Sequence, residues 1–170
     1  MEDLKQLDVE FKRQGDFSEP RGCSVEFAVR LAKAGRVGID NTPLLTCHMA
    51  TQLYEFERSA LQPIAHRILG SGVKRLKHVG TYNCRGLRQF KNILSQHAFA
   101  NAIDVSGFVL EYGQSISVEA DWKRSDPKSQ FLREVSSPAC DAFNVTVSPG
   151  DVVNHWNHLH WDMGLYRNCW

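Results

Sequence analysis

The stretch SQHAFANAID, from Ser95 to Asp104, places a histidine and an aspartate seven residues apart, at His97 and Asp104. Small residues lie between the two and apolar residues follow, which is typical of a buried segment. A buried charge is costly unless it is paired or bound to a metal. The pair therefore indicates a metal site, provided that the chain supplies a third ligand elsewhere.

Candidates for the third ligand lie near the end of the chain, in HLH, at His158 and His160. This segment has the pattern of a strand, and a period of two directs both imidazoles to the same face. Two imidazoles and one carboxylate with an open fourth position are typical of a catalytic zinc site. His-x-His pairs also occur on ordinary strands, so the spacing alone leaves coincidental histidines as the alternative.

The elements that would position these residues can be read from the apolar periodicity. Apolar residues alternate from Val25 to Leu31, which predicts a strand, although a helix would also tolerate this stretch. Next we expect a long helix capped at Asn41 or Thr42, with Pro43 in its first turn. Apolar residues then recur at spacings of three and four as far as Ile68, which indicates a core-facing stripe.

We expect that helix to bend near Pro63 and to end at Gly70 and Gly72. The remaining segments predict a strand in VKRLKHVGTYN, a loop leading to His97, a hairpin that turns around Gly113, a helix capped near Asp126, and a short strand in NVTVSPGD. Residues 1–22 are polar and predict an N-terminal arm, followed by one α+β domain over residues 23–170.

Composition excludes several classes of function. The chain has 170 residues, which suits one core, and its net charge is +1 with both signs intermixed. That balance argues against a nucleic-acid partner or a polybasic membrane patch. We find no transmembrane segment. The charged start has no apolar run of a signal peptide, so we expect any leader to have been removed.

The five cysteines stand far apart, and none forms a CxxC pair. This spacing argues against a zinc site formed by cysteine thiolates. Wide spacing favours disulfides in an oxidising compartment, and buried reduced cysteines in a cytosolic protein are the alternative. We expect a Cys140–Cys169 bridge, a second bridge among Cys23, Cys47 and Cys84, and one thiol left over.

These segments resemble known families. SQHAFANAID resembles the SxHxxGxAxD motif of the D-Ala-D-Ala metallopeptidases, and HLH resembles the final HxH that they share with lysostaphin-type peptidases and the hedgehog domain. The chain from Cys23 to Cys169 is more closely similar to the bacterial extensin-like C-terminal family, through TYNCRGLRQFKNILSQHAFANAIDVSGF, SVEADW, FLREV and H..HLHWDMG.

The resemblance implies a Zn²⁺ site formed by His97, Asp104 and His160, on a small antiparallel sheet flanked by helices, in a hedgehog/DD-peptidase-like fold. It also implies a peptidoglycan peptide as the substrate, and export from a bacterial cytoplasm. Two positions depart from the motif. Ala100 replaces its glycine, so we expect that the loop cannot use a glycine-only conformation there, and Gln96 stands where relatives often carry glutamate.

The chemistry that this resemblance implies needs a base. In several relatives a carboxylate lies three residues before the last ligand, but that position is Asn157 here, which cannot act as a base. His158 is therefore our candidate for the catalytic base, the alternative being that it only hydrogen-bonds within the site. Arg85 is our second catalytic candidate, since a guanidinium suits a substrate carboxylate or an oxyanion; a plain surface charge is its alternative.

Other residues near the motifs have two readings each. Asp162 is either an alternative ligand or a carboxylate that supports one. His155 lies either at the rim of the site or in an exposed loop, and Ser95 either bonds within its loop or contacts peptide. Trp156 and Trp161 flank HLH and either line a substrate groove or pack beside the sheet.

We therefore expect a periplasmic or secreted zinc metallopeptidase, monomeric, that hydrolyses peptide bonds in peptidoglycan. The alternative is a zinc-bound cell-wall-binding module without turnover, which would share all of the ligands.

Overall fold

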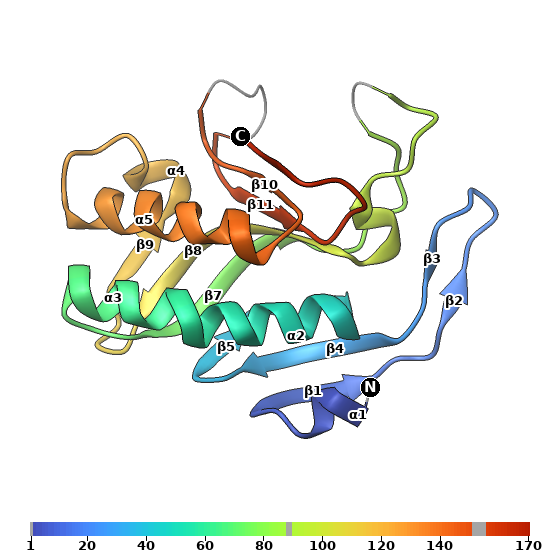
Figure 1. The fold of residues 1–170 in the computed structure, drawn as a ribbon, viewed down its shortest axis with the longest axis horizontal. Coiled ribbons are helices and arrows are strands. Elements are labelled where there is room, and N and C mark those ends of the chain that lie inside the picture. Colours follow the sequence, from blue (N-terminus) through green and yellow to red (C-terminus); the bar gives the residue numbers. More distant parts are fainter. Residues whose placement is uncertain (1, 88–89, 151–155) are drawn as a thin grey trace.

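The computed structural model describes residues 2–87, 90–150 and 156–170 of the chain. They form one α+β domain, shown in Figure 1. The elements are, in chain order, α1 (Glu2–Lys5), β1 (Val9–Arg13), β2 (Phe17–Ser18), β3 (Ser24–Val25), β4 (Ala28–Ala34), β5 (Val37–Ile39), β6 (Leu44–Thr46), α2 (Cys47–Phe56), the π-helical turn η1 (Glu57–Leu61), α3 (Gln62–Leu69), β7 (Val73–Gly80), the 3₁₀ turn η2 (Gln96–Phe99), β8 (Ala102–Leu110), β9 (Ser115–Ser117), α4 (Val118–Asp121), α5 (Pro127–Ala142), β10 (Val145–Val147), β11 (Leu159–Asp162) and β12 (Asn168–Cys169).

The main sheet differs from the small antiparallel sheet that we expected. Within the described residues it has ten strands in the order β1-β4-β5-β7-β8-β11-β10-β12, with β6 paired to β4 and β9 paired to β8. It is mixed, because β5 pairs with β7 and β10 pairs with β12 in parallel. The β5–β7 pair is parallel because the connection between them includes the long helical segment from α2 to α3, and parallel neighbours need such a crossover.

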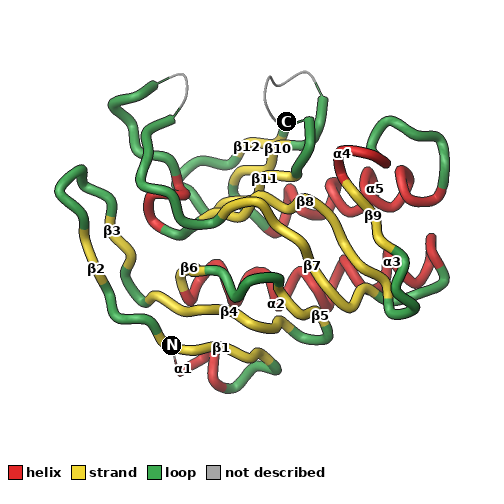
Figure 2. Tube along the Cα trace, turned by 180° about the vertical axis from the view of Figure 1, so that it is seen from behind, coloured by secondary structure: helices red, strands yellow, loops and turns green. Residues whose placement is uncertain are grey.

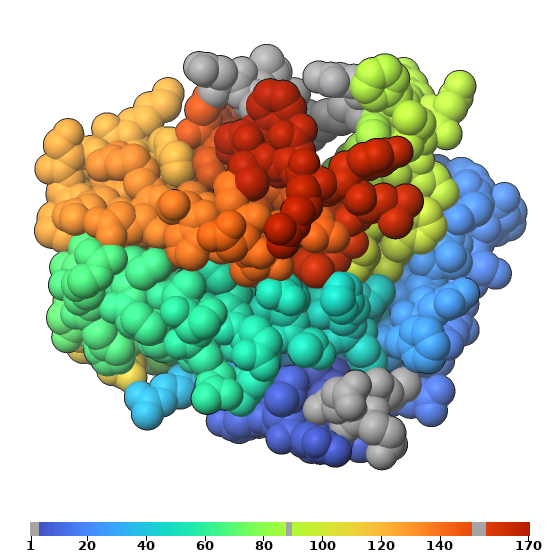
Figure 3. Space-filling view, viewed as in Figure 1, coloured from blue at the N-terminus to red at the C-terminus, as the bar shows by residue number. Residues whose placement is uncertain are grey.

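The helices lie on one face of this sheet. Figure 1 shows α2, α3 and α5 in front of the strands, and Figure 2 shows the strands from the opposite side. In the space-filling view the teal and orange of these helices cover most of the face turned to the viewer (Figure 3). The core lies between the two layers, where Phe143 stacks on Trp161 at 5.0 Å between ring centroids and Phe56 meets Trp161 edge-on at 5.1 Å. The opposite face of the sheet carries the polar side chains described below.

The long helix begins later than its cap prediction placed it. Asn41 and Thr42 have positive φ values of 57° and 42° and form a turn into β6, which pairs with β4. The cap is Thr46, whose Oγ1 accepts from the backbone N of Met49 at 3.1 Å. Sheet pairing over Leu44–Thr46 therefore overrides the local helix-start signal at Pro43.

The irregularity that we expected near Pro63 takes the form of the π-helical turn η1, directly before α3. Proline cannot donate a backbone hydrogen bond, and a wider turn before it is one way to accommodate this. Within η1 the buried carboxylate of Glu57 accepts from Arg36 N at 3.1 Å and from Gln62 Nε2 at 2.8 Å. The helix ends at Gly70, in the left-handed conformation at φ 65°, as expected.

Residues 1–22, which we expected to form an arm, are integrated into the domain where the structure describes them. β1 pairs antiparallel with β4, and Leu4 is buried in the main core. The turn from β1 leads into the β2–β3 hairpin, a separate two-stranded sheet. The polar composition of this segment hid its strands because β1 lies at the sheet edge, where only some of its side chains are buried.

The other element predictions are confirmed. β7, β10 and β11 lie in the segments predicted as strands, and β4 overlaps the strand predicted from Val25 to Leu31, which is interrupted at Phe27 with φ 52°. β8 and β9 form a hairpin whose turn contains Gly113 at φ 94°. Helix α5 follows Asp126, whose Oδ1 accepts from Ser129 N at 3.0 Å.

The disulfide prediction is also confirmed. Cys140 is bonded to Cys169, Cys23 is bonded to Cys84, and Cys47 remains a buried thiol. In the described part of the chain, no helix has the length and apolar character needed to cross a membrane.

Candidate metal centre and cleft

His160 on β11 and Asp104 on β8 are direct cross-strand partners. Strand alternation turns their neighbours Ile103 and Val105 into the core, where both are fully buried. It therefore directs Asp104 and His160 to the face of the sheet that the helices leave open. There the His160 Nδ1 atom lies 2.9 Å from Asp104 Oδ1.

His97 reaches the same point from η2. Ser95 caps this turn, since its Oγ accepts from the backbone N of His97 at 3.3 Å. The histidine is only 2% exposed, and its Nε2 lies 3.2 Å from Asp104 Oδ2 and 3.3 Å from His160 Nδ1. Of the two readings of Ser95, the structure thus shows the bond within the loop.

Ala100 ends η2 in a left-handed conformation, with φ 51° and ψ 29°. This left-handed region is also open to non-glycine residues, so the loop does not need a glycine-only conformation at this position. A non-glycine residue adopts this region at a cost of about 1–2 kcal/mol. The methyl group of Ala100 is fully buried against Val25, Ala28 and Leu44, and this packing offsets part of that cost.

The three side chains lie close enough together to share a metal ion. Donors at zinc distances of about 2.0–2.1 Å lie about 3.3 Å apart when they occupy corners of a tetrahedron. Here His97 Nε2 lies 3.2 Å from Asp104 Oδ2 and 3.3 Å from His160 Nδ1, and His160 Nδ1 lies 2.9 Å from the other carboxylate oxygen, Asp104 Oδ1. Among the described residues, this is the one group of three or more such side chains whose ligand atoms lie within 4.8 Å of one another.

Both histidines have a partner for their outer nitrogen. His97 Nδ1 donates to the carbonyl oxygen of Thr81 at 2.6 Å, which leaves the lone pair of Nε2 directed at the site. His160 Nε2 lies 2.8 Å from Asp162 Oδ2, and Asp162 Oδ1 accepts from Gly164 N at 2.8 Å. Such outer hydrogen bonds fix the ring orientation and tautomer of metal-binding histidines. Asp162 thus supports His160 and does not belong to the group of three ligands.

Electrostatics couple these groups tightly. Burial alone would raise the pKa of Asp104, but hydrogen bonds from His160 and His97 outweigh it and hold that pKa well below its usual range. Burial would lower the pKa of His160, yet its bonds to Asp104 and Asp162 raise that pKa to about 9. In metal-free protein, the protonated ring of His160 therefore donates one hydrogen bond to Asp104 and one to Asp162, and these bonds keep the two carboxylates next to it.

A cleft of about 370 Å³ opens beside these ligands. The residues that line it come from β7, from the segment between β7 and η2, from η2 itself, from β8, and from the segment before β11. They include His97, Asp104, Arg85, Trp156, Asn157 and His158. Both of the catalytic candidates predicted from the sequence, Arg85 and His158, therefore lie at the same cleft as two of the three ligands.

His158 points toward the ligands. Its Nε2 lies 3.5 Å from Asp104 Oδ1, and its Nδ1 lies 2.8 Å from Asn157 Oδ1. The side-chain amide oxygen of Asn157 can only accept, so this contact fits the tautomer that carries its proton on Nδ1. Asn157 is therefore no base, but it orients one.

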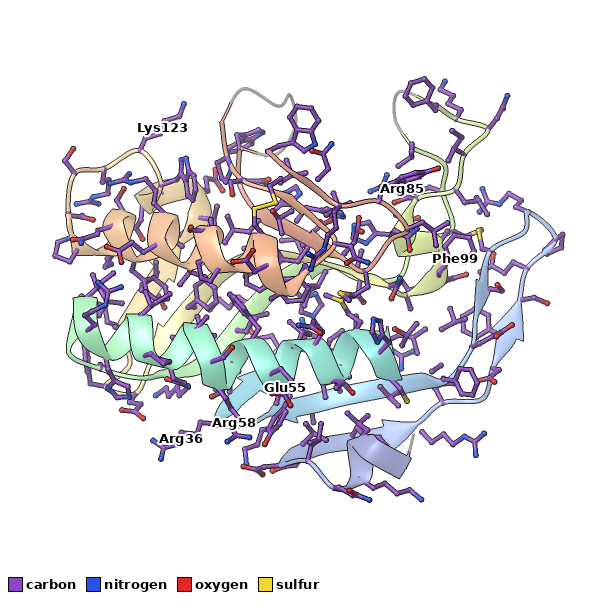
Figure 4. The ribbon with its side chains drawn as sticks, in the orientation of Figure 1. Arg36, Glu55, Arg58, Arg85, Phe99 and Lys123 are labelled. Carbon is purple, nitrogen blue, oxygen red and sulfur yellow. A yellow bond between two sulfur atoms is a disulfide. The ribbon has the colours of Figure 1, made fainter. Side chains whose placement is uncertain are left out.

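Arg85 lies on the segment between β7 and η2 and is partly buried; Figure 4 labels its side chain. Its Nη1 contacts the carbonyl oxygen of Gly86 at 3.5 Å. Within the described part of the chain, no carboxylate forms an ion pair with this guanidinium. It is therefore available to an anionic group of a ligand in the cleft.

The two tryptophans that flank HLH have different environments. Trp156 is 56% exposed and lines the cleft, whereas Trp161 is 1% exposed and belongs to the core. Gln96 does not reach the ligands, because its Oε1 accepts from Asn101 Nδ2 at 3.0 Å on the other side of η2. His155 lies outside the described residues.

Sequence reasoning missed Thr81, Asn83, Val79 and Gly80. The last three line the cleft, and Thr81 acts through its backbone carbonyl. A carbonyl oxygen has no signature in a sequence, and the others carry no spacing that relates them to the ligands. Only the position of β7 next to β8 brings them there.

A larger hollow of about 770 Å³ lies on the far side of η2, lined among others by Phe27, Cys47, Phe99 and Met163. It is more apolar than the cleft and contains no group of three metal-binding side chains among the described residues. The polar cleft is therefore the better candidate for chemistry, although it is smaller.

The comparisons with known proteins identify one family, and it is one that the sequence motifs resemble. No curated protein and no solved structure matches the chain. A family model described as the extensin-like protein C-terminus matches residues 1–170. This match covers the ligands, the cleft and both disulfides, and the chain belongs to the extensin-like protein C-terminus family.

Proposed function

We propose that this domain is a zinc-dependent peptidase that hydrolyses peptide bonds in bacterial peptidoglycan, in a cross-bridge or a stem peptide. The observation that carries the proposal is a cluster beside an open cleft, in which His97 Nε2 and His160 Nδ1 lie 3.3 Å apart and each lies within 3.2 Å of a carboxylate oxygen of Asp104. Two imidazoles and one carboxylate are the donor set of catalytic zinc sites, which keep a fourth position open.

Zinc in such a site polarises the scissile carbonyl and makes water a stronger acid. His158 Nε2 is placed to accept the proton from that water, because its Nδ1 proton is engaged by Asn157 Oδ1. Arg85, across the cleft, suits a substrate carboxylate or the oxyanion that develops on the carbonyl oxygen. Trp156 gives the cleft one apolar wall against which a peptide can lie.

The disulfides and the net charge of the chain agree with a substrate in the cell wall. Two disulfides are typical of proteins that fold in an oxidising compartment, which supports a periplasmic or secreted location. The net charge of +1 gives no support to a nucleic-acid substrate. A peptide substrate in the cell wall is consistent with both.

A second function is favoured by one contact. His158 Nε2 lies 3.5 Å from Asp104 Oδ1 and could itself become a fourth ligand. Four protein ligands would close the site, as in structural zinc sites. The domain would then be a zinc-bound cell-wall-binding module without turnover.

Zinc-loaded protein incubated with purified muropeptides, followed by mass spectrometry, tests both functions. Peptidase activity predicts new fragments that differ by one water across a single peptide bond. His97→Ala should abolish these fragments, while His66→Ala, which removes an exposed histidine on α3, should not. Binding of muropeptides without any fragment, together with one zinc per chain, would favour the binding module.

A further inference from the structure

One wall of the cleft is the segment Thr81–Arg85, called the cleft wall below. The side chains of Asn83 and Arg85 line the cleft. The wall is also bound to the ligand turn η2, since Asn83 N donates to His97 O at 3.0 Å and His97 Nδ1 donates to Thr81 O at 2.6 Å. The position of the wall therefore sets the orientation of His97.

The β2–β3 hairpin, residues 17–25, lies at the edge of the molecule near η2 (Figures 1 and 2) and contacts the cleft wall. The ring of Phe17 meets that of Tyr82 edge-on at 5.3 Å. The Tyr82 hydroxyl donates to the carboxylate of Glu19. Each strand of this hairpin has only two residues, and the hairpin does not pair with the main sheet. A two-stranded hairpin of this kind has little stability of its own.

The Cys23–Cys84 disulfide joins the hairpin to the wall. Cys84 lies between Asn83 and Arg85 in sequence, and Cys23 is fully buried. The bridge packs against Ala98, the residue after His97, which is also fully buried. It is therefore the covalent contact between a weak hairpin and the turn that carries a ligand.

We propose that the Cys23–Cys84 disulfide is a redox-dependent lock that completes the metal site. With the bridge formed, the cleft wall holds the ring of His97 through the Thr81 carbonyl and keeps Arg85 at the cleft. With both cysteines reduced, the hairpin and the wall separate, His97 loses its orientation, and zinc affinity falls. This inference rests on the metal site of the proposed function.

The redox step has simple chemistry. Two thiols lose two protons and two electrons as the Sγ–Sγ bond forms, and a small-molecule disulfide such as oxidised glutathione takes them up and becomes two thiols. In a reducing cytosol the cysteines stay as thiols, so the domain remains metal-poor. Oxidation after export then completes the site, which confines its chemistry to the compartment of the substrate.

The chain offers a matched control in its second bridge. Cys140–Cys169 joins α5 to β12 and closes a loop of 29 residues, against 61 residues for Cys23–Cys84. The chain-entropy model gives the two bridges similar effects on global stability, because loop length enters only as a logarithm. The two differ in place: Cys140 Sγ contacts Thr146 Oγ1 on β10 at 3.3 Å, and the described residues show no contact of this bridge with the cleft wall or η2.

The test compares Cys23→Ala/Cys84→Ala with Cys140→Ala/Cys169→Ala, each purified without chelator. Zinc affinity is measured by competition with a chromogenic chelator, at a temperature where circular dichroism shows both variants folded. We expect an affinity about 10- to 100-fold lower in the first variant, the usual effect of losing an outer partner of a metal-binding histidine. The second variant should stay within about threefold of wild type. Equal affinities in the two variants, low or unchanged, would overturn the lock.

A second measurement covers the case in which Cys23→Ala/Cys84→Ala does not fold. In the Cys140→Ala/Cys169→Ala background the one remaining bridge is Cys23–Cys84, so a dithiol acts on that bridge alone. Hydrogen exchange by mass spectrometry should then show faster exchange in peptides covering residues 81–85 and 95–100 after reduction, and unchanged exchange in α5. Unchanged exchange in the wall would overturn the lock. If the oxidised protein binds no zinc, the proposed function fails, and the exchange data still decide whether the bridge holds the wall.

Discussion

His160 and Asp104 face each other across β11 and β8, with 2.9 Å between His160 Nδ1 and Asp104 Oδ1. Because they are cross-strand partners, the backbone register alone brings the two ligand atoms together. The third member of the cluster, His97, comes from a turn, and its ring is held by the carbonyl oxygen of Thr81. The site therefore has one half built into the sheet and one half held by the loop that packs on it.

The first prediction concerns metal content. Protein purified without chelator should contain close to one zinc per chain by elemental analysis, because the three side chains of His97, Asp104 and His160 are already gathered at one point. Asp104→Ala should lose most of it, since the carboxylate is the shared partner of both histidines. Full zinc retention in both Asp104→Ala and His97→Ala would exclude this site.

The second prediction separates the base from the ligand. His160→Ala should lose both zinc and muropeptide cleavage, whereas His158→Ala should keep its zinc and lose about 10²- to 10⁴-fold in rate, the usual scale for a general base. Zinc content and cleavage are measured side by side. Cleavage at the wild-type rate in His158→Ala would place the base elsewhere, and loss of zinc in that variant would indicate a fourth ligand and favour the binding module.

The third prediction concerns Asp162. In Asp162→Asn the amide oxygen should stay with Gly164 N, which directs the amide N–H₂ toward His160 Nε2. The ring would then carry its proton on Nδ1, the atom that must bind the metal. We expect zinc affinity to fall about 10- to 100-fold. Asp141→Asn, an exposed carboxylate on α5, is the control, and equal affinities for the two variants would show that Asp162 does not set the tautomer.

The fourth prediction concerns pH. Between pH 6.5 and 9 the stability of the zinc-free protein should fall, whereas its affinity for zinc should rise. In zinc-free protein the pKa of His160 is raised to about 9, so its contribution is fully present below its unfolded pKa of about 6.5 and is lost as pH rises through 9. The pKa of Asp104 is lowered, so its contribution is lost only in acid. Chelator-treated protein should therefore melt at lower temperature at pH 9 than at pH 6.5.

Zinc and a proton compete for His160 Nδ1, so zinc affinity should rise over the same range of pH. Differential scanning fluorimetry with and without zinc measures both effects. A melting temperature of the zinc-free protein that rises steadily from pH 6.5 to 9 would contradict the assignment for His160.

The fifth prediction concerns the bridge at the end of the chain. Oxidised protein should show one thiol per chain under denaturing conditions, from Cys47. Cys140→Ala/Cys169→Ala should lose about 3–4 kcal/mol of unfolding free energy, because the bridge closes a loop of 29 residues. Urea denaturation measures this. Five reactive thiols in protein made under oxidising conditions would point back to a cytosolic protein.

Much of the site could be predicted from the sequence because its signals are local. The turn at Gly113, the cap at Asp126 and the alternation around HLH depend on a few neighbouring residues, and all three are present in the structure. The same local logic failed at Pro43, where pairing of β6 with β4 outweighs the helix-start signal. It also failed for residues 1–22, where an edge strand needs few apolar residues.

By itself, the sequence determined the residue types of the site and the common face of His158 and His160, because side-chain direction in a strand follows from its period of two. Only the tertiary structure decided which groups support those residues: the Thr81 carbonyl behind His97, the carboxylate of Asp162 behind His160, and the Cys23–Cys84 bridge behind the wall. These contacts join segments far apart in the chain. Their formation depends on the register of the sheet and on packing in three dimensions, which no short-range pattern encodes.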